Sequence, residues 1–208
     1  MTSKIQDLLD KAAAITASST GKMSSVASAA RNFPAETEAE KCFAELREKL
    51  FQIEKWNADS GLSSYELFDE SGIVSERKTA KINDFIKTTL AGSGKSDWVK
   101  IIDIDASADE IVLTVQPSYN PTEDAPDESV TSHFFTREST NNFCLQRKGD
   151  TLNFYVIGLD EKSNTEDTNN IVETARNVAT ANIGHYLGIQ KGEWTTFCKN
   201  FLEIEDNK

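Results

Sequence analysis

Apolar residues repeat with two different periods along the chain, and the change of period divides the sequence into parts. Within residues 34–56 apolar side chains recur every three or four positions, which predicts one long amphipathic helix. Within residues 63–159 they alternate with polar ones over short runs, which predicts about seven strands. Residues 168–204 return to helical spacing. Short connections join antiparallel neighbours, so we expect the strands to form an antiparallel sheet.

This order of elements predicts an α+β fold. We expect a twisted antiparallel sheet of about six to seven strands, packed against N- and C-terminal helices, within a single domain over residues 33–208. A small closed β-barrel with flanking helices is the alternative.

Residues 1–32 are rich in Ala and Ser, and their apolar stripes are thin. Ile5 and Leu8 fall at helical spacing before Gly21, and Met23 and Val26 do so after it. Methyl groups bury little apolar area, so these stripes provide little stabilisation. We therefore expect a weakly packed arm of two helices.

The strand expected over residues 97–104 is apolar on both faces. Trp98, Ile102 and Ile104 alternate with Val99 and Ile101. A sheet with one solvated face alternates cleanly between apolar and polar residues, so both faces of this sheet should be covered. The helices at 34–56 and 168–204 can cover one face. The arm, a second copy of the chain, or curling of the sheet around a pocket would cover the other.

The charge balance excludes several classes of partner. The 208 residues carry a formal net charge of -12, and no run of Lys and Arg forms a basic patch. Such a surface repels phosphate backbones and anionic lipid, so we expect no nucleic acid or membrane partner. The N-terminus lacks a signal peptide's uninterrupted apolar core, which favours a cytoplasmic protein. The scattered Cys42, Cys144 and Cys198 fit buried thiols in a reducing compartment.

A phosphate-binding loop is suggested by Gly94, Lys95 and Ser96, but its pattern is incomplete. The first glycine of the motif would fall at Thr89, and a strand pattern follows the motif where a helix is needed. We read residues 91–97 as a hairpin loop, so no nucleotide is expected.

The alternating acidic residues Asp103, Asp105 and Asp109 have a spacing typical of calcium loops. Ala108 and Thr114 stand where that motif needs glycine and glutamate, so we expect no metal there. The acidic, proline-rich residues 117–129 are expected to form an exposed loop. We expect no bound cofactor.

A run of mixed polar and aromatic residues, 129–137, has the alternation of a strand. It would place His133, Phe135 and Arg137 on one face, with Tyr155 on the same face of a neighbouring strand. Together with Trp98, these four residues are our candidates for ligand binding: aromatic rings would line a pocket, and His133 or Arg137 would orient a polar group.

Two functions fit these features. The first is a non-enzymatic interaction protein, in which an apolar sheet face and the arm mediate self-association or docking of a protein partner. The alternative is a binding domain for a small apolar ligand, with a cavity between the curved sheet and the C-terminal helix. An enzyme is less favoured, because no catalytic motif is present, although distant residues can also assemble a catalytic site.

Overall fold

The computed structural model describes residues 3–18, 22–90, 96–164 and 192–204. Its labelled elements are α1 (Lys4–Ala17), β1 (Met23–Asn32), α2 (Glu36–Phe51), the 3-10 helix η1 (Ile53–Ala58), β2 (Ser63–Phe68), β3 (Phe85–Leu90), β4 (Ser96–Ala106), β5 (Glu110–Pro117), β6 (Thr140–Lys148) and β7 (Thr151–Glu161). Residues 192–201 are also helical and are called the C-terminal helix below.

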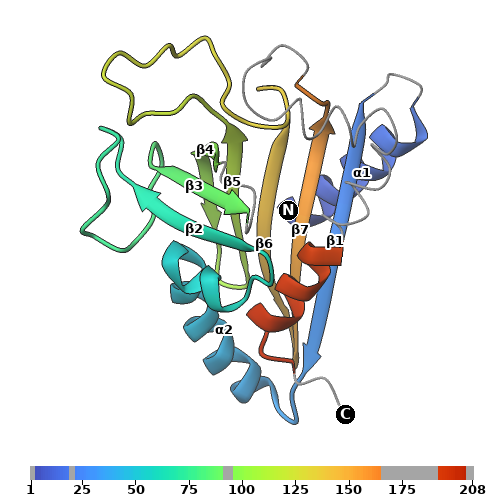
Figure 1. Cartoon of the computed structure of the whole chain (residues 1–208). Coiled ribbons are helices and arrows are strands. Elements are labelled where there is room, and N and C mark those ends of the chain that lie inside the picture. The colour runs from blue at the N-terminus through green and yellow to red at the C-terminus, as the bar shows by residue number, and fades with distance from the viewer. Residues whose placement is uncertain (1–2, 19–21, 91–95, 165–191, 205–208) are drawn as a thin grey trace.

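The strands form one seven-stranded sheet in the order β1-β7-β6-β5-β4-β3-β2, and every neighbouring pair is antiparallel. Figure 1 shows that the sheet curls, with β2 and β3 turned across the front of the other strands. β1 and β2 remain separate edges, so the sheet is a half-barrel rather than a closed barrel. The predicted α+β class and antiparallel sheet are confirmed.

The inner, concave face of the sheet is covered by α2, η1 and the C-terminal helix (Figure 1). The helical spacing predicted within 34–56 is confirmed over α2, where Ala39, Phe43, Leu46 and Leu50 are buried. The chain leaves the α-helix at Gln52 and continues as η1, which buries Ile53 and Trp56. These side chains and the inner residues of the strands make the main hydrophobic core.

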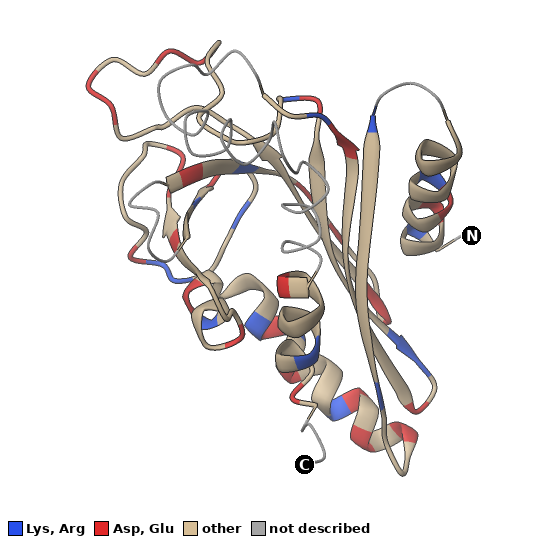
Figure 2. Ribbon diagram, turned by 45° about the vertical axis from the view of Figure 1, so that its right-hand side comes forward, with Lys and Arg blue, Asp and Glu red and all other residues tan. Residues whose placement is uncertain are grey.

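The outer face is covered by α1, which lies on the far side of the sheet from α2 and the C-terminal helix (Figure 2). Ile5, Leu8 and Ala12 of α1 pack with Cys144 and Ile157 of the sheet. The other half of the outer face carries a smaller cluster of Phe68, Phe85 and Trp98, against which Tyr119 packs. The prediction that both faces are shielded is confirmed, and part of the arm is what covers the second face.

The second helix predicted for the arm is wrong, because Met23–Asn32 form the edge strand β1. β1 pairs with β7 along nearly its whole length, from Met23 opposite Glu161 to Asn32 opposite Thr151. This long ladder outweighs the weak local preference of Ala and Ser, which tertiary pairing commonly overrides. Whether residues 1–32 are less stable than the rest stays a prediction.

Two of the predicted strand segments also differ from the structure. Residues 78–84 are irregular, with a turn at 82–83 and with Lys78 and Asn83 at positive φ, and the strand begins only at Phe85. Residues 129–137 lie in no named strand. Their backbone groups bond to several separate segments, including Ser118 and Lys162, and so do not form one continuous ladder.

A β-bulge at Ile102 shifts the pattern of faces along β4. Ile101 lies opposite Val115, whereas Asp103 lies opposite Thr114, so β4 has one extra residue between them. Ile104 therefore packs against the inner core together with Ile101, and not with Trp98 as simple alternation predicts. None of the described helices combines the length and the hydropathy that a membrane crossing needs.

Candidate functional site

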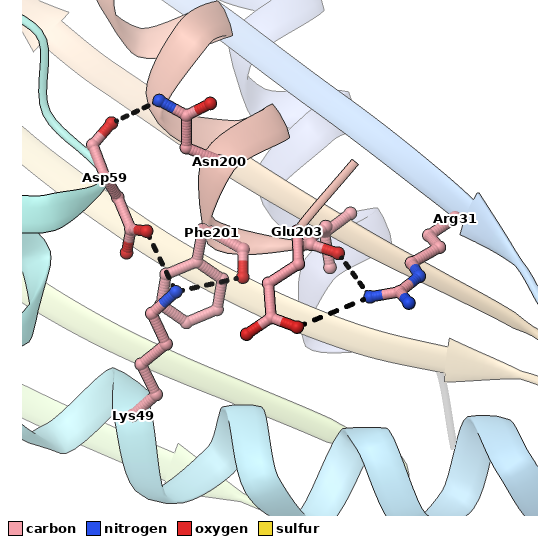
Figure 3. Close-up of polar contacts among 7 residues, drawn as sticks. Arg31, Lys49, Asp59, Asn200, Phe201 and Glu203 are labelled. Atoms are coloured by element: carbon pink, nitrogen blue, oxygen red, sulfur yellow. Dashed lines mark hydrogen bonds and ion pairs between the residues drawn. The ribbon is translucent and has the colours of Figure 1, made fainter. Parts of the chain in front are cut away.

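The C-terminal helix is fixed to the inner face by charged and polar contacts at both of its ends. Near its start, the Glu193 carboxylate accepts hydrogen bonds from the Ser60 and Ser63 hydroxyls and from the Leu62 backbone N–H, at 2.9–3.2 Å. Near its end, Lys49 of α2 donates to the Phe201 carbonyl at 3.3 Å and to Asp59 at 2.9 Å (Figure 3).

A second cation, Arg31 of β1, donates to the Leu202 carbonyl at 2.9 Å and lies 3.7 Å from the Glu203 carboxylate (Figure 3). The last carbonyls of a helix lack intrahelical partners and carry the negative end of its dipole, so cations stabilise them. Asn200 also donates to the Asp59 carbonyl at 3.0 Å. These contacts hold the helix end against α2, η1 and β1.

Aromatic rings fill the inner face beneath this helix. Phe201 stacks on Phe154 with ring centroids 4.1 Å apart, and Phe197 and Trp194 contact Phe143 of β6 at 6.2 and 5.6 Å. Trp194 is half-buried and packs against the main hydrophobic core. We call this group, with Trp56, the aromatic cluster.

One row of the inner face beyond the aromatic cluster is polar. Asn141 lies on β6, two residues before Phe143, and is opposite Gly158 of β7. On the other side of β7, Gly158 is opposite Ser25 of β1. Paired residues of neighbouring strands project from the same face, so these three positions form one row across the sheet. We call Ser25, Asn141, Gly158 and Glu161 the polar row.

Glu161 reaches this row because of a bulge in β7. Met23 lies opposite Glu161 and Ser25 lies opposite Gly158, so β7 has an extra residue in this interval. The extra residue is accommodated by the backbone of Asp160, whose φ of 53° lies in the left-handed region that aspartate tolerates. The bulge directs Glu161 over Gly158, where a Cβ on that glycine would lie only 2.6 Å from the carboxyl carbon.

The Glu161 carboxyl is deeply buried and only partly hydrogen-bonded. The residue is 1% exposed, and its Oε1 accepts a hydrogen bond from the Ser25 hydroxyl at 2.9 Å. Burial raises the pKa of Glu161 from 4.5 to about 7, although the Ser25 hydrogen bond acts to lower it. A carboxyl with a pKa near neutrality exists in both protonation states at physiological pH.

Four buried polar atoms of the polar row and the aromatic cluster have no hydrogen-bond partner within the described part of the chain. They are Glu161 Oε2, Asn141 Oδ1 and the indole nitrogens of Trp56 and Trp194. The Trp56 and Trp194 rings contact the Phe143 ring at 4.5 and 5.6 Å, and Asn141 is two residues from Phe143. Buried polar groups are nearly always paired, so such a group is typical of a place where another molecule binds.

The structure brings three of the five predicted site residues onto neighbouring segments. The Trp98 N–H donates to the Ser132 carbonyl at 2.9 Å, which places His133 beside β4. His133 Nδ1 accepts from the Phe135 N–H at 2.9 Å, and burial lowers the pKa of His133. Phe135 is 1% exposed and forms a bridge with Ser163, just beyond β7.

The other two predicted residues lie apart from these three. Arg137 is exposed and donates to the Glu128 carbonyl in the proline-rich loop, and Tyr155 is half-buried beneath α1. The expected shared face of His133, Arg137 and Tyr155 is therefore wrong, because residues 129–137 are not a strand. Trp98 and Tyr155 project from the outer face, opposite the C-terminal helix.

Sequence reasoning missed Ser25, Asn141 and Glu161. Ser25 was assigned to a helix, and the position of Glu161 depends on the bulge at Asp160, which alternation cannot reveal. One signal was present: Asn141 is a polar residue at the start of an otherwise apolar strand face that continues with Phe143 and Leu145.

The acidic motif of β4 has a structural role. Asp103 and Asp105 share the outer face, as predicted, and both pair with Lys4 of α1, at 2.6 and 3.3 Å. Within the described ranges no cluster of His, Cys, Asp and Glu could hold a metal ion. Gly94 and Lys95 lie outside the described residues, and Ser96 is the first residue of β4.

The fold resembles solved structures, although no family model and no curated protein matches the sequence. Hypothetical protein jhp0584 from Helicobacter pylori is 8% identical, with a TM-score of 0.52 over 90% of each chain. A norcoclaurine synthase from Thalictrum flavum is 10% identical, with a TM-score of 0.41 over 88% of this chain and 96% of that one. A START superfamily protein from Mycobacterium smegmatis is 12% identical, with a TM-score of 0.35 over 81% and 96%. The first likeness shows a shared fold, and the two lower scores carry no conclusion.

Proposed function

We propose that this protein binds a small molecule on the inner face of its sheet. The ligand's polar group would lie at the polar row, and its apolar part would lie against the aromatic cluster. The observation that carries this proposal is that four buried atoms of the polar row and the aromatic cluster have no partner among the described residues. Each such atom costs roughly 1–3 kcal/mol when it has no partner, and a bound ligand would supply those partners.

The arrangement of α1 favours this ligand-binding hypothesis over the interaction protein. The interaction hypothesis needs an apolar sheet face that stays open in a single chain. In the structure α1 covers Val112, Cys144 and Ile157 on the outer face, and the two ion pairs of Lys4 hold its start. The inner face combines apolar rings with buried polar atoms that have no partner among the described residues, as a binding site does.

The test is the binding of a neutral lipophilic dye, N-phenyl-1-naphthylamine, followed by its fluorescence. We expect saturable binding to the natural protein. Ser25→Leu, which fills the polar row, should weaken binding at least ten-fold. Ser28→Leu is the matched control, because Ser28 lies on the same strand and is exposed, and it should stay within two-fold of the natural protein. Absence of saturable binding, or equal affinities for both variants, would overturn the proposal.

A further inference from the structure

Glu161 and Asn141 both present hydrogen-bond acceptors to the polar row, and neither acceptor is satisfied. Glu161 Oε2 and Asn141 Oδ1 are each buried without a partner among the described residues. The only side chain there that hydrogen-bonds to the Glu161 carboxyl is Ser25, which occupies Oε1. Two cations are near Glu161 in the strand pairing: Lys162 is exposed, and Lys22 pairs with Asp160 at 3.0 Å. Among the described residues, the donors of the row are the Ser25 hydroxyl and the Asn141 amide, and no cation acts on the pKa of Glu161.

Strand pairing places the two acceptor residues at adjoining positions of the inner face. Asn141 lies directly opposite Gly158, and the Glu161 carboxyl occupies the space where a Gly158 side chain would begin. Opposite side chains in an antiparallel pair start about 5 Å apart. A nitrogen that bonds to two oxygens at about 2.8 Å each can bridge such a separation.

We infer that the polar row binds the ammonium group of a primary alkylamine, whose chain extends over the aromatic cluster. An ammonium group has three donors and a positive charge, so it can satisfy both oxygens and compensate a buried carboxylate. A neutral carbonyl ligand would require Glu161 to donate its proton and would leave Asn141 Oδ1 unpartnered. Calcium takes six to eight oxygen ligands, far more than this row offers.

The chain of the amine would have an apolar surface to contact. Phe143 lies two residues from Asn141 on the same face of β6, and its ring contacts that of Trp194. Aromatic rings contribute large apolar area to binding sites. The inference rests on the proposed function and adds the chemical class of the ligand to it.

The experiment compares octylamine, 1-octanol and octanoate, each titrated by displacement of N-phenyl-1-naphthylamine at pH 8. We expect octylamine to bind at least ten-fold more tightly than the other two. In Glu161→Gln the affinities for octylamine and 1-octanol should fall within two-fold of each other, while 1-octanol binding is retained. Glu66→Gln, which changes a half-buried carboxylate of β2, is the matched control. This variant should keep the full ten-fold preference for octylamine over 1-octanol.

A second variant keeps the test independent of how well Glu161→Gln folds. Asn141→Leu should weaken octylamine at least five-fold more than it weakens 1-octanol, because the ammonium group loses one of its two acceptors. Equal affinities of the natural protein for the three compounds, or a preference that survives Glu161→Gln, would overturn the amine inference but leave the proposed function standing. If neither the dye nor any octyl compound binds, the proposed function itself is wrong.

Discussion

The two ends of the sheet's inner face differ in whether a cation reaches the buried carboxylate, although Asp59 Oδ2, like Glu161 Oε2, has no hydrogen-bond partner among the described residues. At the end of the C-terminal helix, Lys49 and Arg31 each meet a carbonyl and a carboxylate. At the polar row, Glu161 and Asn141 keep oxygens without partners among the described residues. The first arrangement stabilises the fold by itself, whereas the second costs stability until a partner arrives. The charged groups at the helix end therefore stabilise the folded protein, whereas the Glu161 carboxyl is available to bind another molecule.

The largest effect should come from removing a ring at the helix end. Phe201 is fully buried and stacks on Phe154, so Phe201→Ala should lower the free energy of unfolding by about 4 kcal/mol. Trp194→Ala, at a half-buried ring, should cost about 2 kcal/mol. Urea denaturation measures both, and equal losses would contradict the difference in burial that the structure assigns.

Breaking the buried ion pair at the same end should have the next largest effect. Lys49→Met leaves the Asp59 carboxylate, 6% exposed, without its cation, and should cost about 3 kcal/mol. Burial already raises the pKa of Asp59, although Lys49 acts to lower it. Lys87→Met is the control, because its pair with Glu66 is on the surface, and about 0.5 kcal/mol is expected. A neutral result for Lys49→Met would mean that the helix end is not held by this pair.

Removing the charge of Glu161 in the polar row should raise the free energy of unfolding, whereas removing the charge of Lys49 should lower it. The pKa of Glu161 rises from 4.5 to about 7 in the folded protein, so the folded state binds this proton more tightly than the unfolded state. Stability from this group is therefore complete below about pH 4.5, falls as the pH rises, and levels off above pH 7. Glu161→Gln should stabilise the protein by about 2–3 kcal/mol at pH 8 and by almost nothing at pH 4.

Urea denaturation at the two pH values checks this prediction. Glu66→Gln serves as the control, and its stability should follow that of the natural protein at both. Destabilisation by Glu161→Gln at pH 8 would show that the polar row is satisfied within the folded chain, and the contrast between the two ends would disappear.

The smallest effect belongs to an exposed ion pair outside both ends. Lys4→Ala removes the contacts with Asp103 and Asp105, whose side chains are 49% and 53% exposed. Solvent screens such pairs, so a loss of about 0.5–1 kcal/mol is expected on urea denaturation. A loss as large as that of Lys49→Met would mean that the docking of α1 depends on these charges rather than on Ile5 and Leu8.

Much of the fold could be predicted because its elements carry regular patterns. The strong stripe of α2 and the two-sided apolar strands β4 and β5 were recognisable, since each buries large side chains at fixed spacing. β1 was not recognisable, because its Ala and Ser residues have no strong preference, and its partner β7 is far along the chain. Long-range pairing is not encoded in a local window.

The candidate site was harder to predict for a related reason. Its residues come from three strands, and Glu161 joins them only through the left-handed backbone of Asp160. The sequence correctly assigned Trp98 and Tyr155 to strands. In the structure both side chains project from the outer face, where Tyr155 lies under α1 and Trp98 lies in the cluster that Tyr119 of the proline-rich loop packs against. Their role in ligand binding, like that of His133, Phe135 and Arg137, stays a prediction.

The pairing of β1 with β7 also has a consequence for how the molecule assembles. The hydrogen bond between Ser25 and Glu161 joins residues 136 positions apart, so it cannot form until the chain has been synthesised as far as the end of β7. Contacts of such high sequence separation form late, because the intervening chain must first lose its freedom. A ligand could therefore bind at the polar row only after β1 and β7 have paired. A chain that ends before β7 would contain β1 and the Ser25 hydroxyl but not the Glu161 carboxylate that accepts its hydrogen bond.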